Sequence, residues 1–159
     1  MGDTRYYMGC NRKAREVKIG QHLYVESIVE KLDIKKESKI PATSGVPTLS
    51  KADEPRNPKE EQMRKFPYRE AVGALMWTAT MTRSDIASAV RVVARFCENP
   101  GPARKKAVMK IMQYLLHTKD WGITYGGQDC GLCMEAYTDS DFGACLDTRR
   151  SVSGAVLML

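Results

Sequence analysis

The pattern of apolar and polar positions predicts a β-hairpin and a helix in residues 1–34. Residues 5–8 are predicted as a strand, residues 11–14 as the turn, and residues 16–19, where polarity alternates, as the return strand. Over residues 21–32 the apolar side chains recur every three or four positions, which places them on one face of a helix. That face consists of Tyr24, Val25, Ile28, Val29 and Leu32.

Three further helices are predicted over residues 68–81, 84–96 and 103–117, because each segment repeats its apolar residues at helical spacing. Ser84 is the predicted N-cap of the second of these helices, and the run Asn-Pro-Gly-Pro at 99–102 separates the second from the third. Their predicted apolar faces are Val72, Leu75, Met76 and Ala79; Ile86, Val90, Val93 and Phe96; and Ala107, Val108, Ile111, Met112 and Leu115.

The segment 35–67 shows no helical or strand periodicity and is rich in proline and charge, which is typical of a linker or a long surface connection. After Trp121 the pattern predicts strands over residues 122–125, 132–138 and 153–159. The last strand is an apolar run with no turn or polar residue after it. We therefore expect the chain to stop within a domain.

Together these elements predict an α+β fold, and 159 residues that are 43% hydrophobic can bury one ordinary core or two small ones. The predicted division has four parts. Residues 1–34 form the hairpin and helix, residues 35–67 a proline-rich polar linker, residues 68–120 a helical bundle, and residues 121–159 a group of strands.

Most of the excess positive charge lies in one predicted helical region. The chain has a formal net charge of +6, and between residues 91 and 119 seven basic residues face a single acid, Glu98. A basic helix side of this kind can be ordinary solvated surface, or it can contact phosphates without sequence preference. The candidate phosphate contacts are Arg91, Arg95, Arg104, Lys105, Lys106 and Lys110.

The five cysteines are irregularly spaced, which argues against a secreted disulfide framework and for a reducing compartment. Cys130 and Cys133 have the spacing of half a zinc site, so a cysteine-based metal or redox protein is one alternative, although no second such pair follows. The sequence has neither a signal peptide pattern nor an apolar run of about 20 residues. We expect an intracellular protein, cytoplasmic or nuclear, with no membrane contact.

Six blocks of the chain follow one another in a fixed order: QHLYVESIVEKL (21–32), YREAVGALMW (68–77), TRSDIASAV (82–90), KIMQYLLHTKDWG (110–122), YTDSDFG (137–143) and TRRSVSG (148–154). In order and spacing they resemble the Pol polyprotein of copia-type LTR retrotransposons, and the resemblance covers nearly the whole chain. Ser84, His117 and Phe142 depart from the residues usual in that family, which are proline, glycine and tryptophan.

The resemblance implies that residues 1–34 are the remainder of a reverse transcriptase palm, residues 68–120 a thumb-like or connection-like region, and residues 121–159 the opening strands of a truncated ribonuclease H-like fold. In the parent enzyme this region would contact an RNA–DNA hybrid or another duplex, beside the rest of the Pol polyprotein. The paired aspartates that hold the two magnesium ions of a polymerase would lie upstream, since no such pair occurs before Asp139.

Asp139 matches the first carboxylate of a ribonuclease H site, in which clustered carboxylates bind Mg²⁺, and Asp141 would be a neighbour of that ligand. The other carboxylates of the family would lie beyond Leu159. The resemblance therefore implies an incomplete magnesium site and a fragment that is inactive alone, while it leaves open whether the chain should be called an enzyme.

A rival hypothesis is a stand-alone nucleic-acid-binding or adaptor module, in which the helices and basic residues are the function and the aspartates are incidental. Aromatic residues could stack on bases in either case. Their helical spacing among aliphatic residues favours positions in the core instead; these aromatic residues are Tyr68, Trp77, Tyr114 and Trp121.

Overall fold

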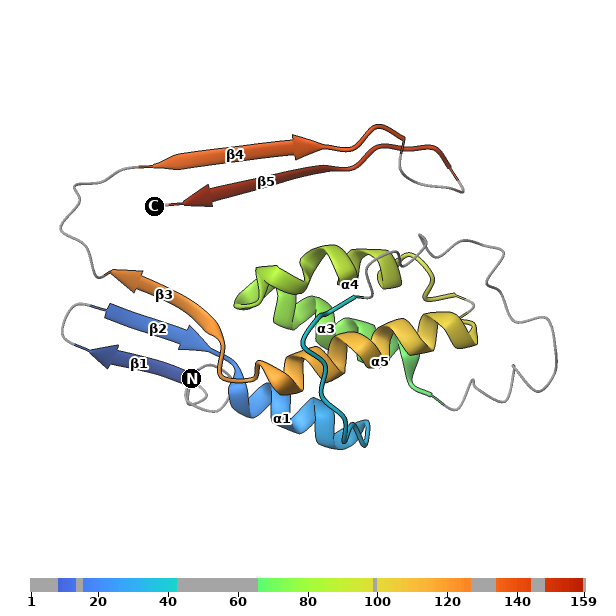
Figure 1. The fold of residues 1–159 in the computed structure, drawn as a ribbon, viewed down its shortest axis with the longest axis horizontal. Coiled ribbons are helices and arrows are strands. Elements are labelled where there is room, and N and C mark those ends of the chain that lie inside the picture. Colours follow the sequence, from blue (N-terminus) through green and yellow to red (C-terminus); the bar gives the residue numbers. More distant parts are fainter. Residues whose placement is uncertain are drawn as a thin grey trace. The chain divides into compact units, whose positions relative to one another are not determined.

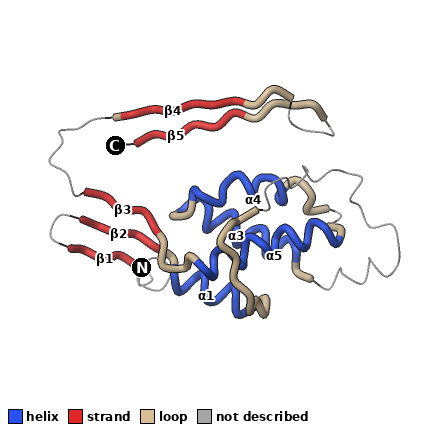
Figure 2. Tube along the Cα trace, viewed as in Figure 1, coloured by secondary structure: helices blue, strands red, loops and turns tan. Residues whose placement is uncertain are grey.

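The N-terminal strands form an antiparallel hairpin in the computed structural model, which describes residues 9–13, 16–42, 66–98, 100–126, 134–143 and 148–158 (Figures 1 and 2). β1 (Gly9–Lys13) pairs with β2 (Glu16–Gly20) along its whole length. The predicted turn over residues 11–14 is wrong for Asn11–Lys13. These residues continue the ladder, whose backbone hydrogen bonds form regardless of side-chain polarity. The predicted strand over residues 5–8 lies outside the described residues.

A third strand, β3 (Gly122–Gly126), extends this sheet in the order β1-β2-β3 and pairs antiparallel with β2. Gly122 stands opposite Gly20, and a Cβ atom on Gly122 would lie 2.2 Å from the carbonyl oxygen of Ile19. Only glycine fits this close approach without movement of the backbone. The pairing places β3 in the sheet of the hairpin, whereas the sequence pattern predicted it as the first strand of a separate group in residues 121–159.

The described helices occupy the predicted segments. They are α1 (His22–Lys31), α3 (Tyr68–Met81), α4 (Ala87–Ala94) and α5 (Pro102–His117). The prediction of Ser84 as an N-cap is wrong, because Ser84 opens a 3-10 turn, η3 (Ser84–Ile86), and α4 begins after it without a side-chain cap. Pro102 starts α5, where its fixed φ suits the first helical turn and its missing N–H costs nothing.

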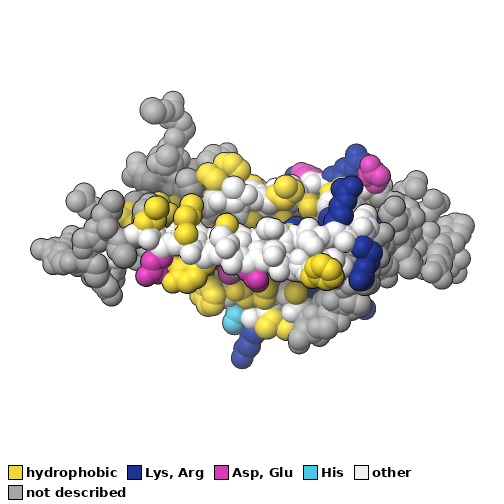
Figure 3. Space-filling view, turned by 90° about the horizontal axis from the view of Figure 1, so that it is seen from above, with side chains coloured by type: hydrophobic (Ala, Val, Ile, Leu, Met, Phe, Trp, Pro, Cys, Tyr) yellow, Lys and Arg dark blue, Asp and Glu magenta, His cyan; other side chains and the backbone are white. Residues whose placement is uncertain are grey.

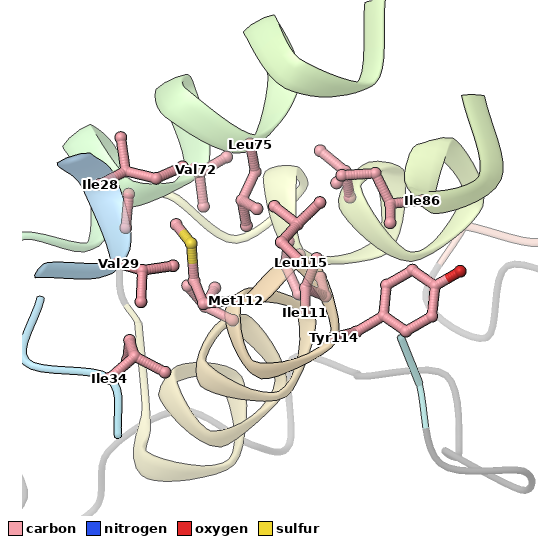
Figure 4. Close-up of a cluster of buried hydrophobic side chains, with 14 of the residues drawn as sticks. Ile28, Val29, Ile34, Val72, Leu75, Ile86, Ile111, Met112, Tyr114 and Leu115 are labelled. Atoms are coloured by element: carbon pink, nitrogen blue, oxygen red, sulfur yellow. The ribbon is translucent and has the colours of Figure 1, made fainter. Parts of the chain in front are cut away.

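One hydrophobic core joins the helices, and α5 runs between α1 on one side and α3 and α4 on the other (Figures 1 and 4). Most of the predicted apolar positions lie in it. Met76 is the exception, since 51% of its surface is exposed although it was predicted on the buried face of its helix. The buried residues are Val25, Ile28, Val29, Ile34, Tyr68, Ala71, Val72, Leu75, Ile86, Val90, Val93, Phe96, Val108, Ile111, Met112, Tyr114 and Leu115.

A short extended segment, the strap (residues 34–42), lies on the C-terminal half of α5. Ile34 and Ser38 are buried, and the backbone N–H of Ser38 donates to the carbonyl oxygen of Gln113 at 3.1 Å. His117 and Glu37 lie 2.8 Å apart. The first part of the proline-rich segment is therefore packed on the helices, while residues 43–65 lie outside the described residues.

The chain divides into two compact units, Met1–Gly126 and Gly127–Leu159. In the second unit, β4 (Glu135–Ser140) and β5 (Ser153–Met158) form an antiparallel pair with Asp139 opposite Gly154. Every residue of both strands is exposed, including Tyr137 and Leu157, and hydrophobic side chains are visible at the surface in Figure 3. Among the described residues, no helix is both long and apolar enough to cross a membrane.

Candidate nucleic-acid interface and the buried Arg83 cluster

Three of the predicted phosphate contacts, Lys105, Lys106 and Lys110, lie in α5 between its first turn and its middle and are called the lysine row below. Lys106 is exposed and the other two are half-buried, with the Lys105 ammonium 5.0 Å from the centre of the Phe66 ring. None of them forms an ion pair with a carboxylate in the described part of the chain. The first turn of α5 also has no acid and no side-chain cap.

Arg104 does not belong to this exposed row. Its side chain is buried, with 1% of its surface exposed, and its guanidinium carbon lies 4.1 Å from the centre of the Phe96 ring. The expectation that Arg104 faces phosphates beside the lysines is therefore wrong in its geometry. A helix places successive residues about 100° apart, so Arg104 points to the core where Lys105 and Lys106 do not.

Arg91 lies in α4 and Arg95 caps its C-terminal end four residues later, away from the lysine row in the sequence. Both are exposed and line a shallow groove between α3 and α4. The Arg95 guanidinium also lies 5.5 Å from the centre of the Phe96 ring. The other described residues that line the groove are uncharged and mostly apolar; they are Met76, Ala79, Thr80, Ala87, Val90 and Ala94.

A cluster of polar residues that was not predicted from the sequence surrounds the buried side chain of Arg83. This side chain is 2% exposed and binds Asp85 through two hydrogen bonds, from Nε to Oδ1 at 2.9 Å and from Nη2 to Oδ2 at 2.7 Å. It also donates to the carbonyl oxygen and to Oγ1 of Thr118 at 2.9 and 2.6 Å. The Arg83 cluster thus ties the turn between α3 and α4 to the end of α5.

Two aromatic rings complete the Arg83 cluster. The guanidinium carbon lies 5.5 Å from the centre of the Tyr114 ring and 5.8 Å from that of Trp121, and the two rings meet edge to face. Tyr114 donates its hydroxyl proton to Oδ2 of Asp85 at 2.8 Å. Burial raises the pKa of Asp85, but the hydrogen bonds from Arg83 and Tyr114 outweigh burial and hold that pKa below its ordinary value.

The same turn contacts the start of α1. Thr82, which is buried, donates its hydroxyl proton to Oε1 of Gln21 at 2.7 Å. Gln21 directly precedes α1 and is 1% exposed, and its Nε2 has no hydrogen-bond partner among the described residues. The turn between α3 and α4 therefore contacts elements from both ends of the first unit.

The predicted aromatic core positions are confirmed for two of the four residues. Tyr68 and Tyr114 are buried, and the Tyr68 hydroxyl donates to the carbonyl oxygen of Val93 at 2.9 Å. The prediction is wrong for Trp77 and Trp121, which are 46% and 57% exposed. Trp121 still contacts Tyr114 and Arg83 with part of its ring.

Asp139 lies on β4 and is exposed beside a shallow hollow that is also lined by Thr138, Ser140 and residues 153–155. Its Oδ1 accepts the backbone N–H of Ser140 at 2.8 Å, and Oδ1 of Asp141 accepts the backbone N–H of Val152 at 3.0 Å. No three metal-ligating side chains gather anywhere in the described ranges. The described residues alone therefore do not fit a magnesium site, and the pair Cys130 and Cys133 lies outside them.

Comparison with curated proteins finds the retrovirus-related Pol polyprotein of transposon TNT 1-94 from Nicotiana tabacum, which is 37% identical over 145 residues, or 90% of this chain. The corresponding polyprotein of transposon RE1 from Arabidopsis thaliana is 33% identical over 92 residues, or 58% of the chain. The chain belongs to the copia-type Pol polyprotein family. It spans 11% of the length of the TNT 1-94 polyprotein and 6% of that of RE1.

A further relative of this Pol segment has a different kind of name. Secreted RxLR effector protein 161 of Plasmopara viticola is 33% identical over 97 residues, which are 61% of this chain and 68% of that protein. No family model matches the chain, and no solved structure is significantly similar to it.

The Arg83 cluster combines residues from separate blocks of the family resemblance. Arg83 and Asp85 belong to the block at 82–90, Thr118 to the block at 110–122, and Gln21 opens the block at 21–32. A sequence signal for the cluster was present, because an arginine between two predicted helices is followed two residues later by an aspartate in the first turn of the second. That spacing alone is common in turns, and it did not reveal Thr118 as the partner.

Proposed function

We propose that the chain is a segment of a Pol polyprotein whose first unit holds the phosphate backbone of a nucleic acid duplex through the lysine row of α5. The observation that carries this proposal is the set of three lysines, Lys105, Lys106 and Lys110, on a helix whose first turn has no acid. The membership in the Pol polyprotein family supports a nucleic acid as the partner.

The electrostatics of a helix explain why this arrangement favours an anion. The N-terminus of a helix carries about half a positive charge, so each added cation in the first turn destabilises the helix by about 0.3–1 kcal/mol. In α5, Lys105 and Lys106 add to that charge, and no acid of the first turn offsets it. Phosphates that approach this end of α5 would offset both the lysines and the exposed N–H groups.

The end of α5 beyond Lys110 is excluded from such a contact by the strap. Gln113 accepts a hydrogen bond from the backbone of Ser38, and His117 lies beside Glu37. Gln113 and His117 follow Lys106 and Lys110 along the same side of α5 at a spacing of three or four, so the strap covers that side of the helix after Lys110. The lysine row therefore precedes the part of α5 that the strap covers.

In the parent polyprotein, we propose an RNA–DNA hybrid as the bound duplex and a ribonuclease H-like fold for the second unit, with Asp139 as one of its Mg²⁺ ligands. Magnesium would supply the activated water and the charge neutralisation of phosphodiester hydrolysis. Asp139 and Asp141 alone do not fit that ion, so we expect the purified chain to cleave no RNA–DNA hybrid in the presence of magnesium. Metal-dependent cleavage that disappears in Asp139→Asn would contradict this expectation.

The binding proposal is tested by fluorescence anisotropy with a short labelled RNA–DNA hybrid at low salt. We expect weak binding that falls with salt, and at least about tenfold weaker binding for K105E/K106E/K110E. The slope of log K against log salt should become shallower by about 2–3, since each lost phosphate contact removes about 0.9.

A matched control reverses three other exposed lysines of the same unit, K35E/K36E/K39E, and so gives the same change in net charge. This variant should bind within about threefold of the unmodified chain. If both triple variants weaken binding equally, only the net charge matters and the lysine row is ordinary solvated surface. Absence of any binding by the unmodified chain would also overturn the proposal.

A further inference from the structure

The groove between α3 and α4 differs from the lysine row in the chemistry of its lining. Its floor is Val90, which is 3% exposed, and small side chains from both helices leave it open: Ala79 from α3, and Ala87 and Ala94 from α4. Met76 borders the groove on α3, with half of its surface in solvent. A phosphate backbone gains nothing from such an apolar floor, whereas an apolar side chain does.

The charged residues that line the described part of the groove both carry a positive charge. Arg91 lies in α4 and Arg95 four residues later at its C-cap, and no acid is among the described lining residues. Asp85 lies at the turn before α4 but is bound to Arg83. Arg95 already has contacts within the chain, the Phe96 ring among them, yet a guanidinium has five N–H donors and can donate to a carboxylate in addition.

We propose that this groove binds an amphipathic helix of a partner protein, which inserts small apolar side chains and presents two carboxylates four residues apart to Arg91 and Arg95. Charge complementarity selects this occupant, because carboxylates at a spacing of four lie on one side of a helix, as the two arginines do on α4. The Arg–carboxylate pairs fix the register, and the apolar floor contributes most of the binding free energy.

The size of the groove limits the strength of this contact. The eight residues of α4 extend over about 12 Å at 1.5 Å per residue, so two to three turns of a partner helix suffice to fill the groove. Contacts this small are weak and transient, and we expect a dissociation constant on the order of 10–100 μM for an isolated peptide.

The test uses a labelled synthetic peptide of about 15 residues. It has an alanine and leucine stripe along one side and two glutamates four apart beside the stripe; a second peptide has lysines in place of the glutamates. Fluorescence anisotropy with the full chain should show binding of the glutamate peptide and at least about tenfold weaker binding of the lysine peptide. In R91E/R95E this preference should reverse.

Two further variants separate the groove from general charge effects. Ala87→Trp places an indole in the groove from an exposed position. This variant should bind the glutamate peptide about tenfold more weakly, without loss of the helical circular dichroism signal. The variant K35E/K36E, which is changed on the strap, should bind the glutamate peptide with an affinity within about threefold of that of the unmodified chain. These results would locate the peptide in the groove.

Three results would overturn the proposal. The first is equal binding of the glutamate and lysine peptides by the unmodified chain. The second is an R91E/R95E variant that still prefers the glutamate peptide. The third is the absence of peptide binding together with a loss of RNA–DNA hybrid binding in R91E/R95E, which would make the two arginines phosphate contacts. Because the lysine row takes no part in this groove, failure here leaves the proposed nucleic-acid contact of α5 untouched.

Discussion

Substitution of Arg83 by methionine is expected to destabilise the first unit more than any exposed substitution. Methionine keeps much of the aliphatic stem but removes all four hydrogen bonds to Asp85 and Thr118, which are 2.6–2.9 Å long. It leaves the carboxylate of Asp85 partly buried with Tyr114 as its remaining neutral donor. The buried carbonyl oxygen of Thr118 also loses its arginine donor.

The magnitude follows from the loss of one member of a buried ion pair, which typically costs about 3–5 kcal/mol because the other charge stays buried without compensation. Asp85 keeps 32% of its side-chain surface in solvent, so water can replace part of the lost interaction. We therefore expect about 3 kcal/mol, the lower end of that range. This is a large share of the roughly 5–15 kcal/mol that stabilises a typical domain.

Urea denaturation measures this loss, followed by far-ultraviolet circular dichroism and by tryptophan fluorescence, since Trp121 lies beside Arg83. Arg91→Met is the matched control, because it makes the same change at an exposed position and should cost less than about 0.5 kcal/mol. A loss below about 1 kcal/mol in Arg83→Met would refute the view that the cluster holds the unit together.

The same cluster predicts a dependence on pH. The pKa of Asp85 in the folded state is held below its unfolded value of about 4. The ionised Asp85 therefore contributes fully to the stability of the fold above about pH 4, and this contribution is lost as the pH falls through the folded pKa. In Arg83→Met the donor that lowers this pKa most is absent. The decline in stability between about pH 4 and pH 2 should therefore be shallower than in the unmodified chain.

Two further predictions concern the tyrosines and the second unit. Burial raises the pKa of Tyr68, so its contribution to the stability of the fold is present below the unfolded value of about 10 and declines at higher pH. Tyr68→Phe should lower the free energy of unfolding by about 1 kcal/mol and make the alkaline decline of the urea midpoint shallower. An unchanged alkaline decline in this variant would contradict the prediction. Hydrogen exchange should be slow in α3, α4 and α5 and fast in β4 and β5, because an exposed two-stranded sheet is marginally stable; strong protection of residues 135–158 in a monomer would contradict this.

The helices could be predicted from the sequence because their signal is local. Apolar residues at a spacing of three and four mark α1, α3 and α5, and their observed ends differ by one residue or so from the predicted ones. Met76 shows the limit of this signal. Its position in the sequence resembles that of Leu75, but the core side of a helix is fixed by the neighbouring helices and not by the helix itself.

Long-range pairings could not be predicted in this way. The strand β3 follows α5 directly and has the pattern of an independent opening strand, yet it pairs with β2, more than a hundred residues earlier in the chain. Arg104 likewise has the sequence context of an exposed basic residue, yet it is buried and its guanidinium lies against the Phe96 ring, which is distant from any local pattern in α5. Both outcomes depend on contacts between segments that no local pattern encodes.

Three of the six segments through which the chain resembles its family meet at the turn between α3 and α4. Thr82 contacts Gln21 before α1, and Arg83 contacts Thr118 at the end of α5, so one turn joins three blocks that are far apart in the sequence. Arg83, Thr82 and Thr118 are buried at this junction, and each forms a hydrogen bond there. This arrangement suits a support that fixes the angle between helices, while the proposed binding surfaces consist of exposed charges elsewhere on the helices. A variant in the Arg83 cluster should therefore destabilise the first unit and weaken both nucleic-acid binding and peptide binding. Variants in the lysine row should weaken nucleic-acid binding alone, and variants in the groove should weaken peptide binding alone.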